Sequence, residues 1–291
     1  MSASIKILVA CHKPFPVPEN GIYLPIQVGK ALSSEEIGFQ GDDEGDNISS
    51  KNPYYCELTA LYWAWKNLKE TDIVGLCHYR RYFDFHRQGI CFMPDTSFPV
   101  SAIRDLDFSI DSRSVERIMK GAVVVPRSLP CASSLHLQYC EGHISDDFRR
   151  LEDIIKTTQP VNYAEAFRQQ LMEGFRIRPY NMMIMRRQDF DDYCSWLFDI
   201  LSRVEEQVDI SHYSSYQQRI FGFMSERLFG VWLSAENKQL IERPVIYLNE
   251  KCSKRFPHRF APRKTVMHYL REWRCAQINW LYKRDLKYKA Y

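Results

Sequence analysis

Three basic side chains follow an apolar run in the stretch IVGLCHYRRYF, residues 73–83. The run ends at Cys77, and His78, Arg80 and Arg81 come after it. An Arg side chain offers a planar fork of N–H donors that matches the oxygens of a phosphate group. The stretch therefore indicates a site for an anionic ligand, phosphate above all. In the alternative interpretation, the two arginines form ion pairs with acidic neighbours and His78 is a buried histidine with a satisfied hydrogen bond.

Polar side chains and one proline flank the other apolar runs of strand length. They are His12 and Lys13 after residues 5–11, Pro126 and Arg127 at the end of 121–127, and Tyr180 and Asn181 at the start of 180–187. In open α/β sheets, ligands bind at the carboxyl ends of the strands. Basic and hydrogen-bonding groups dominate that edge, which again favours an anionic ligand. Asn181 also suits a simple turn asparagine.

Few carboxylates are placed to act as a general base. Glu226 lies in the apolar helical block FMSERL and could deprotonate a hydroxyl group, although an ion pair with Arg227 would also explain it. Asp146 and Asp147 in GHISDDF are further candidates, but SDD is also an adequate helix start. His143, just before them, could contact an acceptor molecule.

The acidic stretch GDDEGDN, residues 41–47, is the place where a hard cation could bind. Its spacing departs from that of the twelve-residue calcium loop, so a solvated acidic loop is the favoured interpretation. A helix is expected over residues 54–68. Glu57 falls in its first turn, where interaction with the helix dipole is a sufficient explanation for a carboxylate.

The elements that must position these groups alternate along the chain. Continuous apolar runs predict strands and helical spacing predicts helices. The strands are expected at 5–11, 71–79, 121–127 and 180–187, and the helices at 54–68, 114–120, 145–157, 163–173, 188–208 and 216–234. Strands that are apolar throughout and separated by helices imply a mainly parallel central sheet flanked by helices. The predicted fold class is α/β.

Composition excludes several classes of protein. The 291 residues are 45% hydrophobic and contain no apolar run of about 20 residues, the length of a spanning helix. The nine cysteines are scattered, so neither a disulfide framework nor a structural zinc site is expected, and a cytoplasmic location without a signal peptide fits best. The sequence contains no GxxxxGK[ST] motif, which excludes a P-loop kinase or ATPase, and no GxGxxG motif for a dinucleotide. It also contains neither a GxSxG nor an HExxH motif.

The charge is unevenly distributed. Residues 251–291 carry twelve Lys and Arg against two acidic residues, whereas residues 1–250 carry 27 basic and 34 acidic residues. We therefore predict a nucleotide-binding α/β domain over 1–250 and a basic, aromatic-rich helical extension over 251–291. The extension suits either an anionic membrane surface or a solvated helix packed on the body. Because the body is acidic, a nucleic-acid partner is not expected.

Several blocks of the sequence resemble a bacterial family of capsular and O-antigen polysaccharide loci. The family was long labelled a domain of unknown function and is now taken as a glycosyltransferase family. The blocks, which run in order from about residue 5 to 248, are IKILVACHKP, GDDEGDNISSKNPYYCELTALYWAWKN, DIVGLCHYRRYF, PYNMMIMRRQDFDDYCSWLFDIL and FGFMSERLFGVWL. The resemblance implies transfer of a hexose, such as galactose or galactofuranose, from a UDP-sugar.

The resemblance also implies a glycosyltransferase A-like fold and a lipid-linked glycan acceptor in capsule, O-antigen or lipopolysaccharide synthesis, at the inner face of the inner membrane. Many enzymes of that fold hold Mn²⁺ or Mg²⁺ on an Asp-x-Asp pair, but here basic residues stand at that place, so a metal-independent reaction is favoured. The expected donor contacts are Ala10, His12, Lys13, Asn47, Lys51, Asn52, Glu57, His78, Arg80, Arg81 and Asn181. The expected catalytic residues are Glu226, His78 and Asp147, and the expected acceptor contacts are His143 and Tyr180. A sugar-phosphate transferase and a non-catalytic nucleotide-sugar-binding protein are the alternatives.

Overall fold

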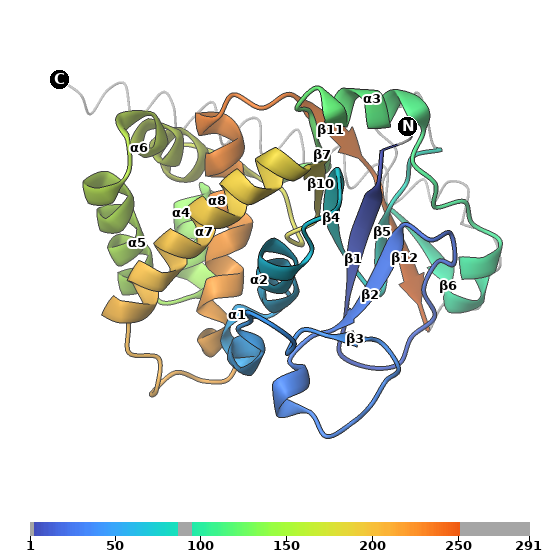
Figure 1. Cartoon of the computed structure of the whole chain (residues 1–291). Helices are drawn as coiled ribbons and strands as arrows, with labels where there is room; N and C mark the ends of the chain where they lie inside the picture. Colours follow the sequence, from blue (N-terminus) through green and yellow to red (C-terminus); the bar gives the residue numbers. More distant parts are fainter. Residues whose placement is uncertain (1–2, 87–94, 251–291) are drawn as a thin grey trace.

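The computed structural model describes residues 3–86 and 95–250, which form an α/β fold around one large mixed sheet (Figure 1). The sheet order is β11-β7-β10-β4-β1-β2-β3, with β5, β12 and β6 attached beside β4. The strands are β1 Ile5–Cys11, β2 Tyr23–Gln27, β3 Gln40–Gly41, β4 Ile73–His78, β5 Arg81–Phe83, β6 Thr96–Pro99, β7 Val123–Pro126, β10 Met183–Arg186, β11 Leu240–Arg243 and β12 Val245–Asn249. A separate hairpin pairs β8 Leu129–Pro130 with β9 Arg176–Ile177.

Helices gather mainly on one side of this sheet, whereas α3 Ser112–Met119, β5, β6 and β12 lie towards the other side (Figure 1). The helices of the larger layer are α1 Asn52–Tyr55, α2 Leu58–Asn67, α4 Leu135–Gly142, α5 Ser145–Thr158, α6 Val161–Phe167, α7 Arg187–Gln207 and α8 Ile220–Ala235. A π-helical turn, Arg168–Met172, continues α6. No helix within the described ranges is long and apolar enough to cross a membrane. The extension predicted over 251–291 lies outside the described residues.

The side chains of β1 alternate between two hydrophobic cores. Leu8 and Ala10 belong to the core under the large helical layer, whereas Ile7 and Val9 belong to the core on the opposite face. All four are buried, because both faces of the strand are covered. This double burial explains why the strand is apolar from Ile7 to Cys11, and it confirms the mainly parallel, helix-flanked sheet.

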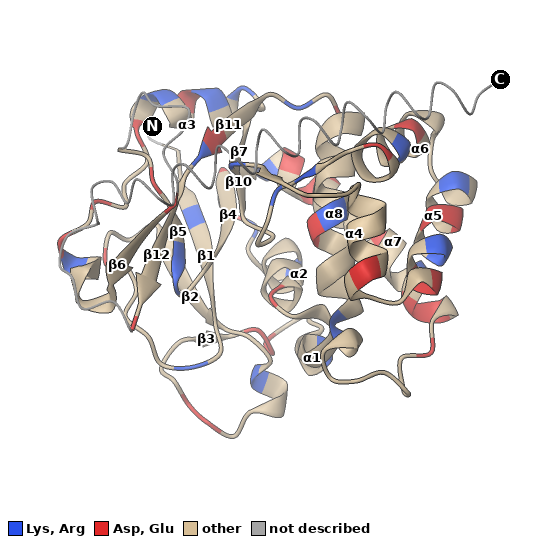
Figure 2. Ribbon diagram, turned by 180° about the vertical axis from the view of Figure 1, so that it is seen from behind, with Lys and Arg blue, Asp and Glu red and all other residues tan. Residues whose placement is uncertain are grey.

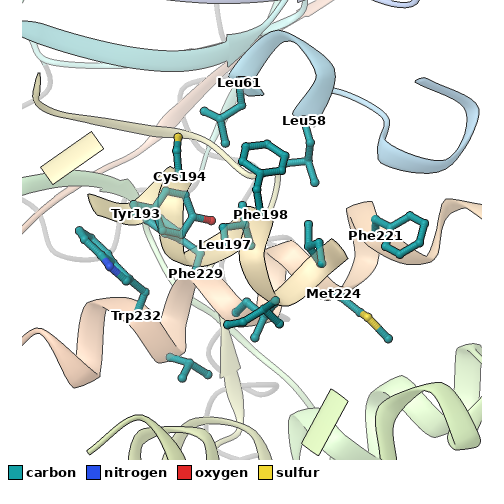
Figure 3. Close-up of a cluster of buried hydrophobic side chains, with 14 of the residues drawn as sticks. Leu58, Leu61, Tyr193, Cys194, Leu197, Phe198, Phe221, Met224, Phe229 and Trp232 are labelled. Carbon is teal, nitrogen blue, oxygen red and sulfur yellow. The ribbon is translucent and has the colours of Figure 1, made fainter. Parts of the chain in front are cut away.

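The larger core is filled by the facing sides of α2, α7 and α8. Figure 3 shows Tyr193 and Leu197 of α7 beside Phe229 and Trp232 of α8, with Leu61 of α2 above them. Tyr193 lies 5.2 Å from each of the rings of Phe229 and Trp232. At the outside of this layer, α5 carries alternating acidic and basic residues on its ribbon (Figure 2). The helical layer is thus apolar inside and charged outside, as amphipathic helices of a globular domain are.

Strand β10 runs antiparallel to both of its neighbours, β4 and β7. In the ladder, Met183 pairs with Leu76 and Arg186 pairs with Ile73, so the start of β10 lies beside the end of β4. The residues before β10 therefore come to the edge where β1 and β4 end.

The helix expected over residues 54–68 is divided in the structure. Helix α1 ends at Tyr55, and Cys56 takes a backbone φ of 53° and ψ of −132° before α2 begins at Leu58. Cys56 lies close to Gly222 of α8, because a Cβ added at Gly222 would stand 3.2 Å from the Cys56 sulfur. The break lies where α8 closely approaches at Gly222, and Glu57 follows it as the N-cap of α2.

Candidate active site

A strained backbone corner lies at the carboxyl edge of the sheet. Tyr180 and Asn181, immediately before the Met182 and Met183 that lead into β10, have φ values of 80° and 51°. Non-glycine residues rarely take a positive φ, and two in succession cost free energy that surrounding contacts must offset. We call these two residues the corner.

The backbone of the corner is held from two sides. The N–H of Tyr180 donates to Oε1 of Glu226 at 2.7 Å, and the Tyr180 carbonyl oxygen lies 2.6 Å from Nε2 of His78. A carbonyl can only accept, so Nε2 carries the proton. The predicted catalytic pair of Glu226 and His78 is therefore joined through one peptide group on each side of Tyr180.

The buried side chain of Asn181 also holds the corner through hydrogen bonds. This residue is 1% exposed, and its Nδ2 donates to Oε1 of Glu57 at 2.7 Å. Its Oδ1 accepts from the hydroxyl of Ser225 at 2.8 Å. Glu57 is the N-cap of α2 but makes no capping hydrogen bond, so capping alone does not account for its carboxylate. That carboxylate accepts from the Asn181 side chain and so supports the corner.

Arg81 covers the outer side of the corner. Its guanidinium carbon lies 4.7 Å from the ring centre of Tyr180 and 5.8 Å from that of Tyr247 on β12, and the two tyrosine hydroxyls are hydrogen-bonded to each other. Neither Arg80 nor Arg81 forms an ion pair within residues 3–86 and 95–250, so the ion-pair interpretation fails over that part of the chain. The Nε of Arg81 is buried and has no hydrogen-bond partner there.

The charges of this cluster perturb one another. Burial raises the pKa of Glu226, and the negative charge of Glu57 adds to that rise, whereas the Tyr180 N–H and the arginines Arg227 and Arg81 oppose it. Burial lowers the pKa of His78 against the opposing influence of Glu57. A neutral His78 that donates from Nε2 has its Nδ1 free of a proton. The cluster thus holds a carboxyl with a raised pKa beside an imidazole that stays neutral.

The alternative explanation for Glu226 was an ion pair with the adjacent Arg227. Arg227 instead donates to the carbonyl of Phe223 at 2.7 Å and to Oε1 of Gln138 at 2.5 Å, and it lies over the ring of Tyr139. The two side chains leave α8 in different directions. Glu226 therefore faces the corner without a direct cationic partner among the described residues.

A second group of predicted residues surrounds the ring of Tyr79 at the same edge. The His12 ring packs edge-on at 5.0 Å, the guanidinium of Arg80 lies 4.9 Å from the Tyr79 centre, and Nζ of Lys13 lies 5.9 Å from it. The carbonyl of Ala10 accepts from the Tyr79 N–H. Next to this group is a cavity of about 450 Å³ lined by Pro14, Phe15, Pro16, Pro99, Val100, Ser101 and Glu250. Basic groups and a hollow thus lie side by side.

Other predicted residues lie apart from the corner. Asp147 on α5 is 3% exposed and accepts from the hydroxyl of Tyr213 at 2.8 Å, so its carboxylate supports the fold of the helical layer. Asn47 bonds within its own loop. Lys51 pairs with Glu205, and Asn52 donates to the carbonyl of Cys56 and to Thr59. None of these four contacts Glu226 or His78.

The acidic loop at 41–47 uses its first aspartate for structure. Asp42 is fully buried and accepts from the backbone N–H groups of Gly29 and Lys30 and from the hydroxyl of Ser49. Across the described part of the chain, no group of three His, Cys, Asp or Glu side chains is arranged to hold a metal ion. The two carboxylates at the corner are engaged with Asn181 and Tyr180 and have Arg81 nearby. They do not match an Asp-x-Asp metal site.

His143, which follows α4, belongs to an aromatic group beside Phe223 of α8. Its ring stacks on Phe223 at 4.1 Å and lies 5.8 Å from Tyr216, and its Nδ1 donates to Oε1 of Gln217 at 3.1 Å. Burial lowers the pKa of His143.

Sequence analysis missed Ser225, Tyr247 and the aromatic residues around His143. Tyr247 had no signal, because β12 was not predicted. Phe223 could have been found, since Arg219, Phe223 and Glu226 recur at helical spacing and share one face of α8.

Comparison with known proteins adds three findings. The profile of a family described as a domain of unknown function, DUF4422, matches residues 6–238. A solved structure described as a WbbM bifunctional glycosyltransferase in its apo state is similar, with a TM-score of 0.73 and 30% sequence identity. The similarity covers 84% of this chain and 45% of that one, so the matched part of this chain spans less than half the length of that protein. No curated protein matches.

Proposed function

The chain belongs to the family described as a domain of unknown function (DUF4422), and from that premise we propose that it is a glycosyltransferase with a glycosyltransferase A-like fold. It moves a hexosyl residue from a UDP-sugar to a glycan acceptor. The observation that carries the proposal is the convergence of Glu226, Glu57, His78 and Arg81 on the corner at the carboxyl edge of the sheet. The similarity to a bifunctional glycosyltransferase supports it.

Glu226 is the candidate base for the acceptor hydroxyl. In a transfer that inverts the anomeric centre, a carboxylate removes the proton while the donor leaves from the opposite face. Burial and Glu57 raise the pKa of Glu226, which makes its carboxylate a stronger base once it is ionised. The Tyr180 N–H fixes one of its oxygens, so the other, Oε2, is directed to the acceptor.

Basic groups serve the donor diphosphate in this proposal. The cationic side chains at this sheet edge are Arg81 at the corner and Arg80 and Lys13 around Tyr79. His12 lies beside them. Leaving-group charge can be stabilised by preorganised donors of this kind. Since the corner carboxylates do not match a metal site, we propose that these side chains neutralise the diphosphate and that neither Mn²⁺ nor Mg²⁺ is required.

The finer features of the proposal come from the resemblance of the sequence blocks to polysaccharide-assembly enzymes. The donor sugar is galactose or galactofuranose, and the acceptor is a lipid-linked glycan of capsule or O-antigen synthesis. The protein acts at the cytoplasmic face of the membrane, and the basic residues 251–291 attach it there.

The test is a panel of nucleotide sugars, including UDP-galactose and UDP-galactofuranose, titrated into the full chain by calorimetry. Each donor is measured with Mn²⁺, with Mg²⁺ and with a chelator. We expect one UDP-sugar to bind with the same affinity in all three conditions. Binding that a chelator abolishes would overturn the metal-independent part, and no binding of any donor would overturn the whole proposal.

A sugar-phosphate transferase is the second candidate, because the same basic groups suit a transferred phosphate. The released nucleotide separates the two reactions. Nucleoside diphosphate indicates glycosyl transfer, and nucleoside monophosphate indicates sugar-phosphate transfer. Donor binding without either product would favour a non-catalytic nucleotide-sugar-binding protein.

A further inference from the structure

An accessible stripe of three residues runs along α8 towards the corner. Arg219 caps the helix, Phe223 follows one turn later and Glu226 one turn after that. Residues three and four apart on a helix are neighbours, with roughly 5–6 Å between their Cβ atoms. Arg219 is exposed, and Phe223 and Glu226 are half-buried, whereas the residues on the opposite side of α8 are buried. The candidate base therefore stands directly beside an aromatic ring.

Two further rings widen this surface. Tyr216, 54% exposed, lies 5.1 Å from Phe223 and packs alongside His143. These rings come from the end of α4 and from the segment before α8. A tyrosine this exposed in a cluster of three rings leaves apolar surface open to a ligand, with hydroxyl and ring-nitrogen atoms at its margin.

Hydrogen bonds orient the His143 ring and the Arg219 guanidinium at this surface. Nδ1 of His143 donates to Gln217, whose own Nε2 donates to the carbonyl of Gly142 and so fixes the orientation of the amide. Because Nδ1 of the neutral ring is the donor, Nε2 is an acceptor. The guanidinium of Arg219 lies 5.4 Å from the Phe223 ring centre and donates from Nε to the sulfur of Cys56 at 3.2 Å. Within the described residues its two terminal nitrogens make no hydrogen bond.

We propose that Tyr216, Phe223, Arg219 and His143 form the subsite for the acceptor glycan, which binds the terminal sugar ring against the aromatic surface. A sugar ring has an apolar C–H face and a rim of hydroxyl groups, and this surface offers ring faces beside one nitrogen acceptor and two free guanidinium nitrogens. A ring seated here has its hydroxyls one helical turn from Glu226. The inference rests on the proposed function for the role of the bound sugar as acceptor, and it goes beyond that function in naming the surface.

The test measures sugar binding directly, by saturation-transfer NMR on the full chain with the methyl and n-octyl glycosides of galactopyranose, galactofuranose and glucopyranose. We expect saturation of ring C–H protons in at least one glycoside. Phe223→Ala and Tyr216→Ala should each weaken that binding about three- to tenfold, the scale of one lost aromatic contact. Tyr216 is exposed, so its variant tests the surface even if Phe223→Ala unfolds.

Met119→Ala is the matched control, because Met119 is a similarly accessible apolar residue, 43% exposed, at the end of α3. Arg219→Met should weaken binding while UDP-sugar binding, measured in parallel by calorimetry, stays within twofold of the wild type. Unchanged glycoside binding in Tyr216→Ala and Phe223→Ala, or no glycoside binding by the wild type, overturns the subsite. If the wild-type protein binds no UDP-sugar, the proposed function is contradicted, and the glycoside measurements alone then decide whether the sugar subsite exists.

Discussion

The side-chain amide of Asn181 donates to the carboxylate of Glu57 at 2.7 Å, across 124 residues of sequence. The contact joins the start of α2 to the corner before β10, and Ser225 of α8 completes it from the other side. Three elements that are distant in the chain thus fix one buried amide. The corner keeps its positive φ angles because these contacts leave it no relaxed alternative.

Asn181→Ala should be strongly destabilising. The variant keeps a left-handed backbone that Ala adopts less readily than Asn, and it loses the side-chain hydrogen bonds to Glu57, Ser225 and Gly222, so we expect the free energy of unfolding to fall by about 2–4 kcal/mol. Asn181→Gly tolerates the φ of 51° and should lose only about 1–2 kcal/mol. Urea denaturation of both variants measures the difference. Equal losses would show that the backbone angle contributes nothing.

Glu226→Gln should strongly slow transfer while it preserves donor binding. Gln can still accept the Tyr180 N–H but cannot remove a proton, so we expect the rate constant kcat to fall by about 10²–10⁴. The donor Kd should stay within twofold. Glu152→Gln, which removes a half-buried carboxylate of α5 that pairs with Lys156, is the control and should act as the wild type. A Glu226→Gln enzyme with more than a tenth of the wild-type kcat would exclude Glu226 as the base.

The raised pKa of Glu226 also predicts how stability depends on pH. The folded protein holds the Glu226 proton up to a higher pH than the unfolded chain, whose carboxyl titrates near its ordinary value of 4.5. Stability from this group is therefore present below 4.5 and is lost as pH rises through the raised pKa. Glu226→Gln has no such loss. Its melting temperature should gain on that of the wild type as pH is raised from 4 towards 8, as thermal unfolding scans at each pH would show, and a constant difference would contradict the assigned direction.

Lysine should not replace Arg81. Arg81→Lys keeps the positive charge but loses the planar fork that can bind a diphosphate and stack on Tyr180, so we expect UDP-sugar affinity to fall about tenfold or more. Arg203→Lys, on the outer side of α7 in an ion pair with Asp199, is the matched control. Calorimetric titration of the donor compares the two. If both variants bind the donor equally well, Arg81 does not contact the diphosphate.

Removal of residues 263–291 should weaken attachment to membranes. The extension carries the whole basic excess of the chain, eight of its twelve Lys and Arg lie in the removed residues, and clustered Lys and Arg bind anionic lipid surfaces. Cosedimentation with vesicles of phosphatidylglycerol and phosphatidylcholine should therefore decrease, whereas UDP binding should not. Pure phosphatidylcholine vesicles provide the control for charge. Equal cosedimentation of the truncated and full chains with the anionic vesicles would refute membrane attachment through this segment.

The strands that form the centre of the sheet were predictable because both of their faces are buried. Runs such as residues 7–11 are apolar throughout, and their ends marked the edge at which His78, Arg81, Tyr180 and Asn181 meet. Strand β2 was missed because YLPIQ is short and interrupted by Pro25. Strand β12 was missed because nothing local distinguishes it from a loop.

The partners within the site could not be predicted from sequence. Glu57 had a sufficient local explanation at a helix start, and only the break at Cys56 turns it to Asn181. That break has no Gly or Pro signal of its own, and it lies where α8 closely approaches at Gly222, a contact that local sequence does not show. Glu226 was found as an anomaly in an apolar block, but its hydrogen bond to the Tyr180 N–H depends on how α8 packs against the sheet.

The antiparallel pairing of β10 fixes the position of the corner, whereas the segment that ends with Tyr216 is free to vary in sequence. Because the corner enters the sheet through a four-residue ladder, a shift by one residue would exchange the two buried faces of the strand, so the position of the corner is fixed by the core. The segment that ends with Tyr216 is bound by no such ladder. Substitutions there can change the sugar that is recognised without moving the carboxylate that reacts with it, and new glycan specificities can arise from one unchanged reaction centre.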